Sequence, residues 1–376
     1  MSNVVISGTG VFTPKEVITN EELVIAFNAY ADLQNEKYAE EIARGERDAI
    51  AYSSEEFIFK ASGIERRHVL NKSGILNPEI MHPIFEKRDD DELSLMAEMA
   101  VEAAKIAMEQ AGRKAEDIDA VIVAASNHER AYPAIAVEIQ QALGIEGFGF
   151  DMNVACSSAT FGIQSAADMI SAGSARAILM VNPEICSGHL EWRDRDCHFI
   201  FGDVCTAVLL EQKNLAVAAD QFEILSTRCL TKFSNNIRNN HGFLRRSLPD
   251  GLSDQRDMQF MQEGRKVFRE VVPIVSELIL SHLKDENIDI GDISRLWLHQ
   301  ANKAMNDFIG RKVLGRLPEP GEQPNILHEY ANTSSAGSII AFSQNSEDLK
   351  DGDLGVICSF GAGYSVGNVI VQKRRL

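Results

Sequence analysis

The chain is organised around residues 147–173, which read GFGFDMNVACSSATFGIQSAADMISAG. The stretch begins as a short apolar run typical of a strand and turns through residues 153–155. After Ser157, small and apolar residues recur at helical spacing up to a glycine typical of a helix C-cap. Cys156 falls at the turn, where the positive end of the helix dipole favours a thiolate and lowers the pKa of the thiol. A cysteine that only fills the core is the other interpretation.

The composition describes an ordinary globular protein with an acidic excess. Its 376 residues allow two domains or one two-lobed unit, with 45% hydrophobic and 24% charged residues. A net charge of −18 argues against binding to nucleic acid and to anionic membranes. The six cysteines are scattered, without a CxxC pair or a zinc spacing with histidine, which predicts free thiols and no metal site. With no signal-peptide pattern and no run of about 18 apolar residues, the protein is expected to be cytoplasmic, with no membrane span.

Two stretches near the N-terminus interrupt the regular pattern. Asn20 is expected to cap a short helix that ends at Phe27. Residues 28–56 follow, charged and helical in propensity, and they predict an insertion packed on the outside. Residues 71–92 contain two prolines and an acidic run, so they predict a loop-rich excursion.

The second half of the chain repeats the first in outline. An apolar strand pattern at residues 118–123 leads to Cys156, and a similar pattern at residues 293–298 leads to Thr333 over nearly the same distance. Each strand is followed by a polar turn, an amphipathic helix ending in Leu-Gly, and a helix start of small residues. The repeated order predicts a duplicated α/β unit with layered sheets and helices. A pseudo-twofold axis would bring the helix starts at Cys156 and Asn332 together.

Three further features of the second half are candidates for chemistry. His299 opens the turn HQAN directly after a strand pattern, and open α/β sheets place ligands at such strand ends; a purely structural histidine is the alternative. Asn332 is either a helix N-cap or an amide donor for a developing oxyanion. Residues 359–364, SFGAGY, predict a tight turn that is able to aim a backbone N–H at an acyl oxygen on Cys156.

Together these motifs resemble those of the thiolase-fold condensing enzymes, and among them the β-ketoacyl-acyl-carrier-protein synthase III family. The resemblance covers nearly the whole chain. The matching motifs are SGTGVFTP near the start, GIERRH at 63–68, VACSSA at 154–159, FGD at 201–203, HQAN at 299–302, NTSSAGS at 332–338 and SFGAGYSVG at 359–367. It implies a duplicated α-β-α-β-α five-layer fold with two pseudo-twofold related halves, 1–212 with the cysteine and 213–376 with the histidine and asparagine.

The resemblance also implies a reaction and a set of roles. Cys156 takes an acyl group from acyl-coenzyme A as a thioester, with the backbone N–H groups of Cys156 and Ala362 as the oxyanion hole. His299 and Asn332 bind the thioester carbonyl of malonyl on an acyl carrier protein and stabilise the enolate formed on decarboxylation. The enolate attacks the acyl-cysteine to give a β-ketoacyl product. A homodimer that uses no metal and no cofactor beyond the coenzyme A thioester is expected.

Some positions depart from the family pattern around coenzyme A. Ala362 replaces the middle glycine of the glycine-rich turn. Phe57 stands where many members have a tryptophan that stacks on adenine. Ala61 replaces an arginine, which leaves Lys60 as a substitute. Arg195 matches a second coenzyme-A-contacting arginine, although the alternating charges around it are also typical of a solvated surface.

The resemblance places residues 264–269, GRKVFR, at a helix start near the mouth of the substrate tunnel, with Arg265, Val267 and Phe268 as substrate contacts. The cations proposed to dock an acidic carrier protein are Arg265, Lys266, Arg269, Arg245 and Arg246. A solvated helix face is the alternative. The two insertions are predicted to cap or extend the acyl tunnel for a primer longer than acetyl. The phenylalanines considered as its lining are Phe57, Phe59, Phe161, Phe233, Phe243 and Phe268.

Other reactions of the same fold remain open at this point. They are a non-decarboxylating condensation of two acyl thioesters, and O- or N-acyl transfer. A degradative thiolase needs a second cysteine inside the glycine motif, and Cys358 lies before it. A non-catalytic subunit is disfavoured because the cysteine, histidine and asparagine are all present.

Overall fold

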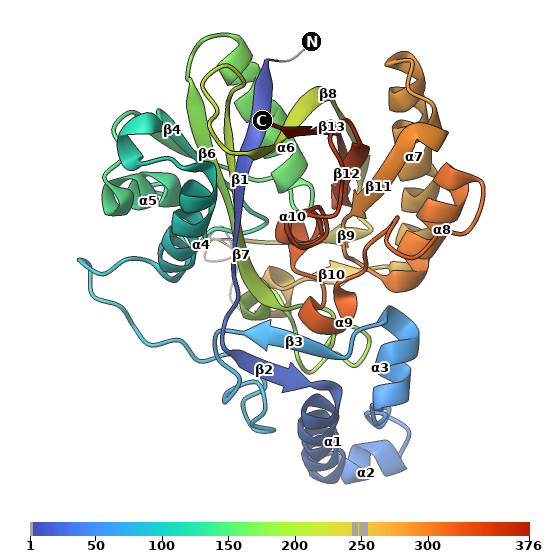
Figure 1. Ribbon diagram of the computed structural model, residues 1–376. Helices are drawn as coiled ribbons and strands as arrows, with labels where there is room; N and C mark the ends of the chain where they lie inside the picture. The colour runs from blue at the N-terminus through green and yellow to red at the C-terminus, as the bar shows by residue number, and fades with distance from the viewer. Residues whose placement is uncertain (1–2, 243–246, 248–254) are drawn as a thin grey trace.

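The structure, a computed structural model, describes residues 3–242, 247 and 255–376. Its centre is a nine-stranded sheet in the order β11-β12-β13-β8-β1-β7-β6-β4-β5 (Figure 1). The strands are β1 (Val4–Phe12), β4 (Ala120–Ala124), β5 (Phe148–Met152), β6 (Ala177–Ile185), β7 (Asp203–Gln212), β8 (Asp220–Ser234), β11 (Ile293–Leu298), β12 (Leu354–Gly361) and β13 (Gly363–Arg375). Two small antiparallel pairs are β2 (Glu16–Thr19) with β3 (Arg66–Val69), and β9 (Ile237–Arg238) with β10 (Met261–Gln262).

The sheet contains the predicted duplication. From its middle outward, β1-β7-β6-β4 and β8-β13-β12-β11 have the same order along the chain and the same directions: two antiparallel pairings, then a parallel one. The two groups join where β1 pairs antiparallel with β8. The chain passes from one group to the other between the end of β7 and the start of β8. The division into halves 1–212 and 213–376 remains a prediction.

Helices cover and separate the two groups of strands. The central helices α6 (Ser158–Ser171) and α10 (Gly337–Gln344) share one hydrophobic core with strands of both groups. On one outer face lie α4 (Leu95–Ala111) and α5 (Ile135–Leu143), and on the other α7 (Gly264–Asp285) and α8 (Lys303–Leu314) (Figure 1). The order helix, sheet, helix, sheet, helix confirms the predicted five-layer fold.

Glycines of β1 allow α4 to pack very closely on the sheet. A Cβ added at Gly8 would lie 2.1 Å from the carbonyl oxygen of Ala107, and one at Gly10 would lie 2.0 Å from that of Ala103. No real Cβ tolerates such a contact, so the backbones of strand and helix meet only because both residues lack one. The small residues of the SGTG motif therefore set the spacing of this layer.

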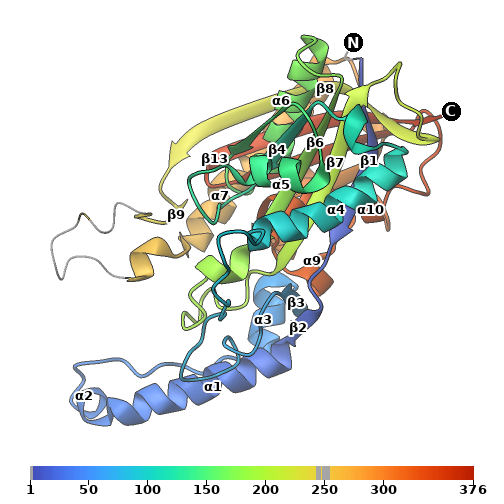
Figure 2. The ribbon, with the colours of Figure 1, turned by 90° about the vertical axis from the view of Figure 1, so that its left-hand side faces the viewer.

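A smaller unit lies below the sheet and contains the first insertion (Figures 1 and 2). It is built from β2, β3, α1 (Asn20–Lys37), α2 (Ala39–Ala43), α3 (Glu55–Ser62) and α9 (Leu327–Tyr330). The expectation of a short helix capped by Asn20 is wrong, because the helical propensity of the insertion carries α1 on to Lys37. Thr19 is the N-cap and forms a capping box with Glu22, whereas Asn20 is buried and donates to the carbonyl of Ile64 at 2.7 Å.

The second insertion, residues 71–92, contains no helix or strand, as predicted. The 3₁₀ turns of the described residues are η1 (Ala115–Asp117), η2 (Cys186–His189), η4 (Gln255–Met258), η5 (Ile290–Asp292) and η6 (Ser334–Ala336). Within the described ranges, no helix is long and apolar enough to cross a membrane. The same ranges contain no group of three or more His, Cys, Asp or Glu side chains arranged to hold a metal ion. All six cysteines are free.

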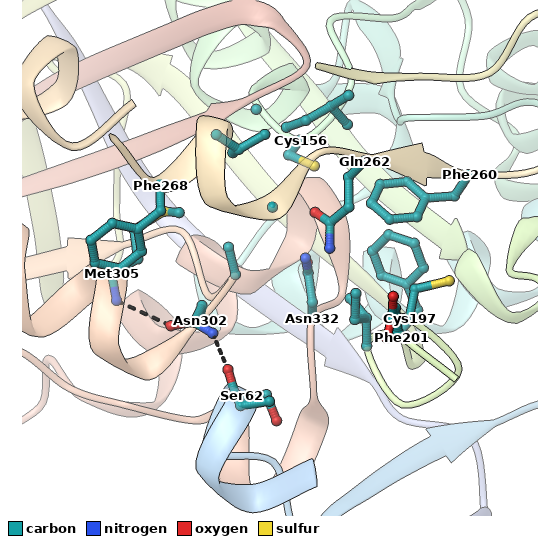
Figure 3. Close-up of a pocket in the computed structure, with 18 of the residues that line it drawn as sticks. Ser62, Cys156, Cys197, Phe201, Phe260, Gln262, Phe268, Asn302, Met305 and Asn332 are labelled. Atoms are coloured by element: carbon teal, nitrogen blue, oxygen red, sulfur yellow. Dashed lines mark hydrogen bonds between the residues drawn. The ribbon is translucent and has the colours of Figure 1, made fainter. Parts of the chain in front are cut away.

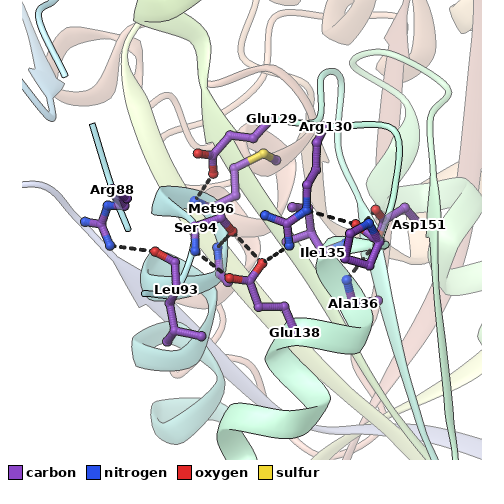
Figure 4. Close-up of polar contacts among 12 residues, drawn as sticks. Arg88, Leu93, Ser94, Met96, Glu129, Arg130, Ile135, Ala136, Glu138 and Asp151 are labelled. Carbon is purple, nitrogen blue, oxygen red and sulfur yellow. Dashed lines mark hydrogen bonds and ion pairs between the residues drawn. The ribbon is translucent and has the colours of Figure 1, made fainter. Parts of the chain in front are cut away.

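Carboxylates at helix N-termini tie β5 to the outer helices (Figure 4). Asp151 on β5 accepts hydrogen bonds from the backbone N–H groups of Ile135 and Ala136, at 2.8 and 2.9 Å, at the start of α5. Glu138 of α5 accepts from the hydroxyl of Ser94, the N-cap of α4, at 2.8 Å. Negative charge at the positive end of a helix is stabilising. The strand that leads into the nucleophile turn is thus fixed to the layer that covers it.

Candidate active site

The turn that presents Cys156 is a strained junction between β5 and α6. Ala155 has a φ of 48°, a conformation that non-glycine residues rarely adopt. Its N–H donates to Asn153 Oδ1 at 2.9 Å, and the N–H of Val154 donates to Ser158 Oγ at 2.8 Å. These bonds hold the turn in place and confirm that Cys156 lies where the strand ends and the helix begins.

The loop of the second half meets this turn directly. Ser334, with a φ of 49°, donates from its hydroxyl to the sulfur of Cys156 at 3.4 Å. Its backbone N–H donates to Asn332 Oδ1 at 2.9 Å, which orients the amide. Figure 3 shows the amide nitrogen of Asn332 pointing into the cavity on the side of Cys156. The predicted approach of the two helix starts is confirmed.

His299 follows β11 and is only 2% exposed. Its backbone N–H donates to the carbonyl of Cys358 at 2.8 Å, and its carbonyl accepts from Asn306 Nδ2 at 2.9 Å. Burial lowers the pKa of the ring to about 3, against a backbone hydrogen bond with Ser334, so the imidazole is neutral. Its Nδ1 is buried and has no hydrogen-bond partner among the described residues. A buried ring nitrogen without a partner is suited to a polar group of a ligand.

The expected lowering of the Cys156 pKa is wrong. Burial raises the pKa of the thiol to about 11, the hydrogen bond from Ser334 acts against this, and the negative charge of Glu184 adds to it. The helix N-terminus is present as expected, but the sulfur lies between the two halves, where desolvation outweighs it. Cys156 therefore rests as a protonated thiol.

Cys156, His299 and Asn332 line one cavity of about 1000 Å³. Figure 3 shows this cavity with Cys156 and Asn332 labelled. Six phenylalanines contribute to its wall: Phe57, Phe199, Phe201, Phe260, Phe268 and Phe360. The glycine turn closes it behind the nucleophile, since a Cβ added at Gly361 would lie 2.6 Å from Cys156 Cβ. The role of the following Ala362 N–H as an oxyanion donor remains a prediction.

The predicted coenzyme A contacts are only partly gathered at this cavity. Phe57, Arg265, Val267 and Phe268 line it. Arg195 lies beside its wall, with its guanidinium 3.9 Å from the centre of the Phe57 ring and Nε donating to the carbonyl of Tyr52 at 2.7 Å. Lys60 is exposed on α3 and is not among the lining residues.

The predicted acyl tunnel needs correction. None of residues 28–56 or 71–92 lines the cavity, so the insertions do not cap it in this chain. Phe59 and Phe233 are 52% and 86% exposed, and Phe161 on α6 is not a lining residue. Phe243 lies outside the described residues, as do Arg245 and Arg246.

Sequence reasoning missed four aromatic lining residues. Phe199 and Phe201 precede or begin the FGD motif, and Phe360 lies in the glycine-rich motif, so motif proximity was an available signal for these three. Phe260 stands in an irregular segment without any pattern. Cys358, the second cysteine that a thiolase would need, is fully buried within β12 and is not a lining residue. Burial raises its pKa.

Such a fold, with a cysteine from one half facing an imidazole and an amide from the other, defines the class of thiolase-fold condensing enzymes. Comparison with known proteins narrows the class. The family described as 3-Oxoacyl-[acyl-carrier-protein (ACP)] synthase III matches residues 150–232, and its C-terminal part matches residues 283–373. The chain belongs to this family of acyltransferases.

Individual relatives agree with this assignment. The chain is 60% identical over 348 residues to the beta-ketodecanoyl-[acyl-carrier-protein] synthase of Pseudomonas aeruginosa, covering 93% of this chain and 99% of that protein. It is 28% identical over 378 residues to the beta-ketoacyl-[acyl-carrier-protein] synthase III of Ehrlichia canis, covering 99% and 100%. The crystal structure of 3-oxoacyl-[acyl-carrier-protein] synthase III from Aquifex aeolicus, 24% identical, has the same fold, with a TM-score of 0.74 over 98% of this chain and 99% of that one.

Proposed function

We propose that this acyltransferase condenses an eight-carbon acyl group from acyl-coenzyme A with malonyl-acyl-carrier protein to form a β-ketodecanoyl product. The observation that carries the reaction type is the meeting of Cys156, His299 and Asn332 in one cavity. The chain length is supported by the relative with 60% identity, named for a β-ketodecanoyl product. Malonyl contributes two carbons after decarboxylation, so a ten-carbon product requires an eight-carbon primer.

In the first step, the sulfur of Cys156 attacks the thioester carbonyl. The N–H groups of Cys156 and Ala362 hold the oxyanion, the bond to coenzyme A breaks, and the thiol proton of Cys156 ends on the departing coenzyme A. In the second step, the malonyl thioester carbonyl binds between the neutral ring of His299 and Nδ2 of Asn332. Carbon dioxide leaves, and the enolate attacks the acyl-cysteine. The released sulfur regains a proton from solvent.

The mouth of the cavity is suited to an acidic carrier protein. Arg265, which lines the cavity, and Arg269 are exposed at the start of α7. The neighbouring α8 adds the cations Arg311 and Lys312 around Phe308, which contacts Phe268 ring to ring at 5.4 Å. With a net charge of −18, such a local basic face is needed to attract an acidic partner. Phe57, with Arg195 stacked on it, is the proposed adenine contact.

Incubation with equimolar acetyl-, octanoyl- and lauroyl-coenzyme A, followed by intact mass spectrometry, tests the first step. Octanoyl is expected as the main adduct on the wild type and on Cys229→Ala, a control cysteine on β8. No adduct is expected on Cys156→Ala. Addition of malonyl-acyl-carrier protein should then release carbon dioxide and β-ketodecanoyl-carrier protein. An acetyl adduct would refute the chain length, and product formation without carbon dioxide would favour the non-decarboxylating reaction.

The proposal includes a homodimer in the cytoplasm that uses no cofactor beyond its thioester substrates. The six free cysteines support a reducing compartment. Size-exclusion chromatography with light scattering tests the dimer, and a monomeric mass at micromolar concentration would contradict it.

A further inference from the structure

The carboxylate of Glu184 takes no part in the steps above, although it is buried close to the nucleophile. It lies near the end of β6 and is 1% exposed. In the described part of the chain it forms no ion pair, and burial raises its pKa to about 7. The ionisable groups that its charge influences include the thiols of Cys156, Cys186 and Cys205. A buried carboxylate without a cation is costly, so we expect it to have a specific use.

Two hydrogen-bond donors to the carboxylate of Glu184 come from Ser126, in the first half of the fold. Ser126, just after β4, donates its N–H to Oε1 at 3.0 Å and its hydroxyl to Oε2 at 2.5 Å. The carbonyl of Ser126 accepts from Asn153 Nδ2 at 2.8 Å. Asn153 in turn holds the N–H of Ala155, the residue before the nucleophile. Glu184 is therefore linked through Ser126 and Asn153 to the turn that presents Cys156.

Cys186 Sγ, in the first half, is a further donor to Oε2 at 3.9 Å, and the remaining donors come from the second half. Ser335 donates its N–H to Oε1 of Glu184 at 3.2 Å and its hydroxyl to the same oxygen. The preceding residue, Ser334, contacts both the sulfur of Cys156 and the amide of Asn332. A single carboxylate thus binds the loop of the nucleophile and the loop of the carbonyl-binding amide.

We propose that Glu184 is a positioning residue for the condensation step, fixing Asn332 relative to Cys156 across the boundary between the two halves. The proposal rests on the proposed function. Acylation needs Cys156 and its own turn, whereas condensation also needs Asn332 at the correct distance. Misplacement of a reacting group by about 1 Å is able to cost about 100-fold in rate. Loss of the carboxylate is therefore expected to affect the second step more than the first.

Two variants separate positioning from simple stability. In Glu184→Gln, the amide oxygen still accepts from both backbone N–H groups, and its NH₂ is able to donate to the hydroxyl of Ser126. In Glu184→Leu, these donors lose their acceptor. For the Leu variant we expect kcat of condensation to fall about 100-fold and acyl-enzyme formation to fall less than about 10-fold. The Gln variant is expected to stay within about 10-fold of the wild type in both steps.

Glu211→Leu is the matched control. Glu211 is also a carboxylate with 1% exposure, on β7, but it pairs with Arg113 at 2.6 Å. The Glu211→Leu variant is expected to have a lower melting temperature and an unchanged ratio of the acylation rate to the condensation rate. The proposal would be overturned if the rates of acylation and condensation fell equally in a folded Glu184→Leu variant, or if that variant condensed at the wild-type rate. If that variant does not fold, Ser335→Ala is tested in its place. The rate of condensation is expected to fall while the rate of acylation stays at the wild-type value. An unchanged rate of condensation would overturn the proposal.

Failure of the proposed function has a different signature. The wild type itself would then form no β-ketoacyl product. In that case crystal structures of the wild type and Glu184→Gln, or Ser335→Ala, still test the positioning. The distance from Ser334 Oγ to Cys156 Sγ, 3.4 Å here, is expected to be kept in the Gln variant and to lengthen in the Ser335 variant. An unchanged distance in Ser335→Ala would overturn the proposal.

Discussion

Replacement of Gly361 by alanine is expected to disable the nucleophile without unfolding the protein. The added Cβ would lie 2.6 Å from Cys156 Cβ and 3.2 Å from its sulfur. Carbon atoms in contact are about 3.5–4.0 Å apart, so Cys156 or the glycine turn has to move by about 1 Å. A displacement of this size at a reacting atom corresponds to about a 100-fold loss in rate. Overpacking of this kind costs about 1–3 kcal/mol in the free energy of unfolding.

The assay measures the rate at which octanoyl-coenzyme A acylates the enzyme after stopped-flow mixing, with intact mass spectrometry as the readout. Thermal unfolding is recorded in parallel to show that the variant is folded. Gly188→Ala is the control, because the nearest atom to a Cβ added there is 3.9 Å away. Its acylation rate is expected to equal that of the wild type. A folded Gly361→Ala variant that is acylated at the wild-type rate would refute the claim that the glycine turn packs against the nucleophile.

Three further predictions concern the thiol, the coenzyme A contact and a buried cation. Because burial raises the pKa of Cys156 to about 11, alkylation of the free enzyme by iodoacetamide is expected to rise about tenfold per pH unit between pH 7 and 10. A rate that levels off below pH 9 would contradict this. Phe57→Ala removes a ring that Arg195 stacks on at 3.9 Å and is expected to raise KM for acyl-coenzyme A about 2–5-fold with kcat unchanged. The exposed Phe59→Ala serves as its control, and equal KM values for the two variants would contradict the contact. Arg67 is 0% exposed and donates to three buried oxygens. Arg67→Met is expected to lower the free energy of unfolding by about 2–5 kcal/mol, measured with urea, and a change below about 1 kcal/mol would contradict it.

The layered fold was predictable from local patterns because buried strands are visible in the sequence as continuous runs of apolar residues. The runs at 118–123 and 293–298 became β4 and β11, each buried within its own group of strands. The pairing of β1 with β8, which joins the halves, is not indicated by any local sequence pattern. It depends on register between segments more than 200 positions apart, as the pairing of Val5 with Glu223 shows.

The candidate site was predictable to a similar depth. Cys156, His299 and Asn332 stand in motifs whose residue types suit the expected chemistry. Their meeting in one cavity was therefore predicted from the sequence. The pKa of Cys156 was not, because helix position is visible in a sequence whereas the density of atoms around a sulfur is not. Phe260 reaches the cavity from a segment without periodicity, and only the closed fold brings it there.

The resting site contains an uncharged nucleophile and an uncharged ring. A thiol with a pKa of about 11 and an imidazole with a pKa of about 3 are both neutral at pH 7. A cavity of low dielectric favours this state, and the same low dielectric strengthens N–H donors toward any anion that forms. The anions of the proposed reaction are an oxyanion and an enolate. The proposal assigns the backbone N–H groups of Cys156 and Ala362 to the oxyanion and the side chains of His299 and Asn332 to the enolate. Because the proton of Cys156 ends on coenzyme A, the acylation step leaves no net charge in the cavity, so burial that disfavours a free thiolate is compatible with catalysis.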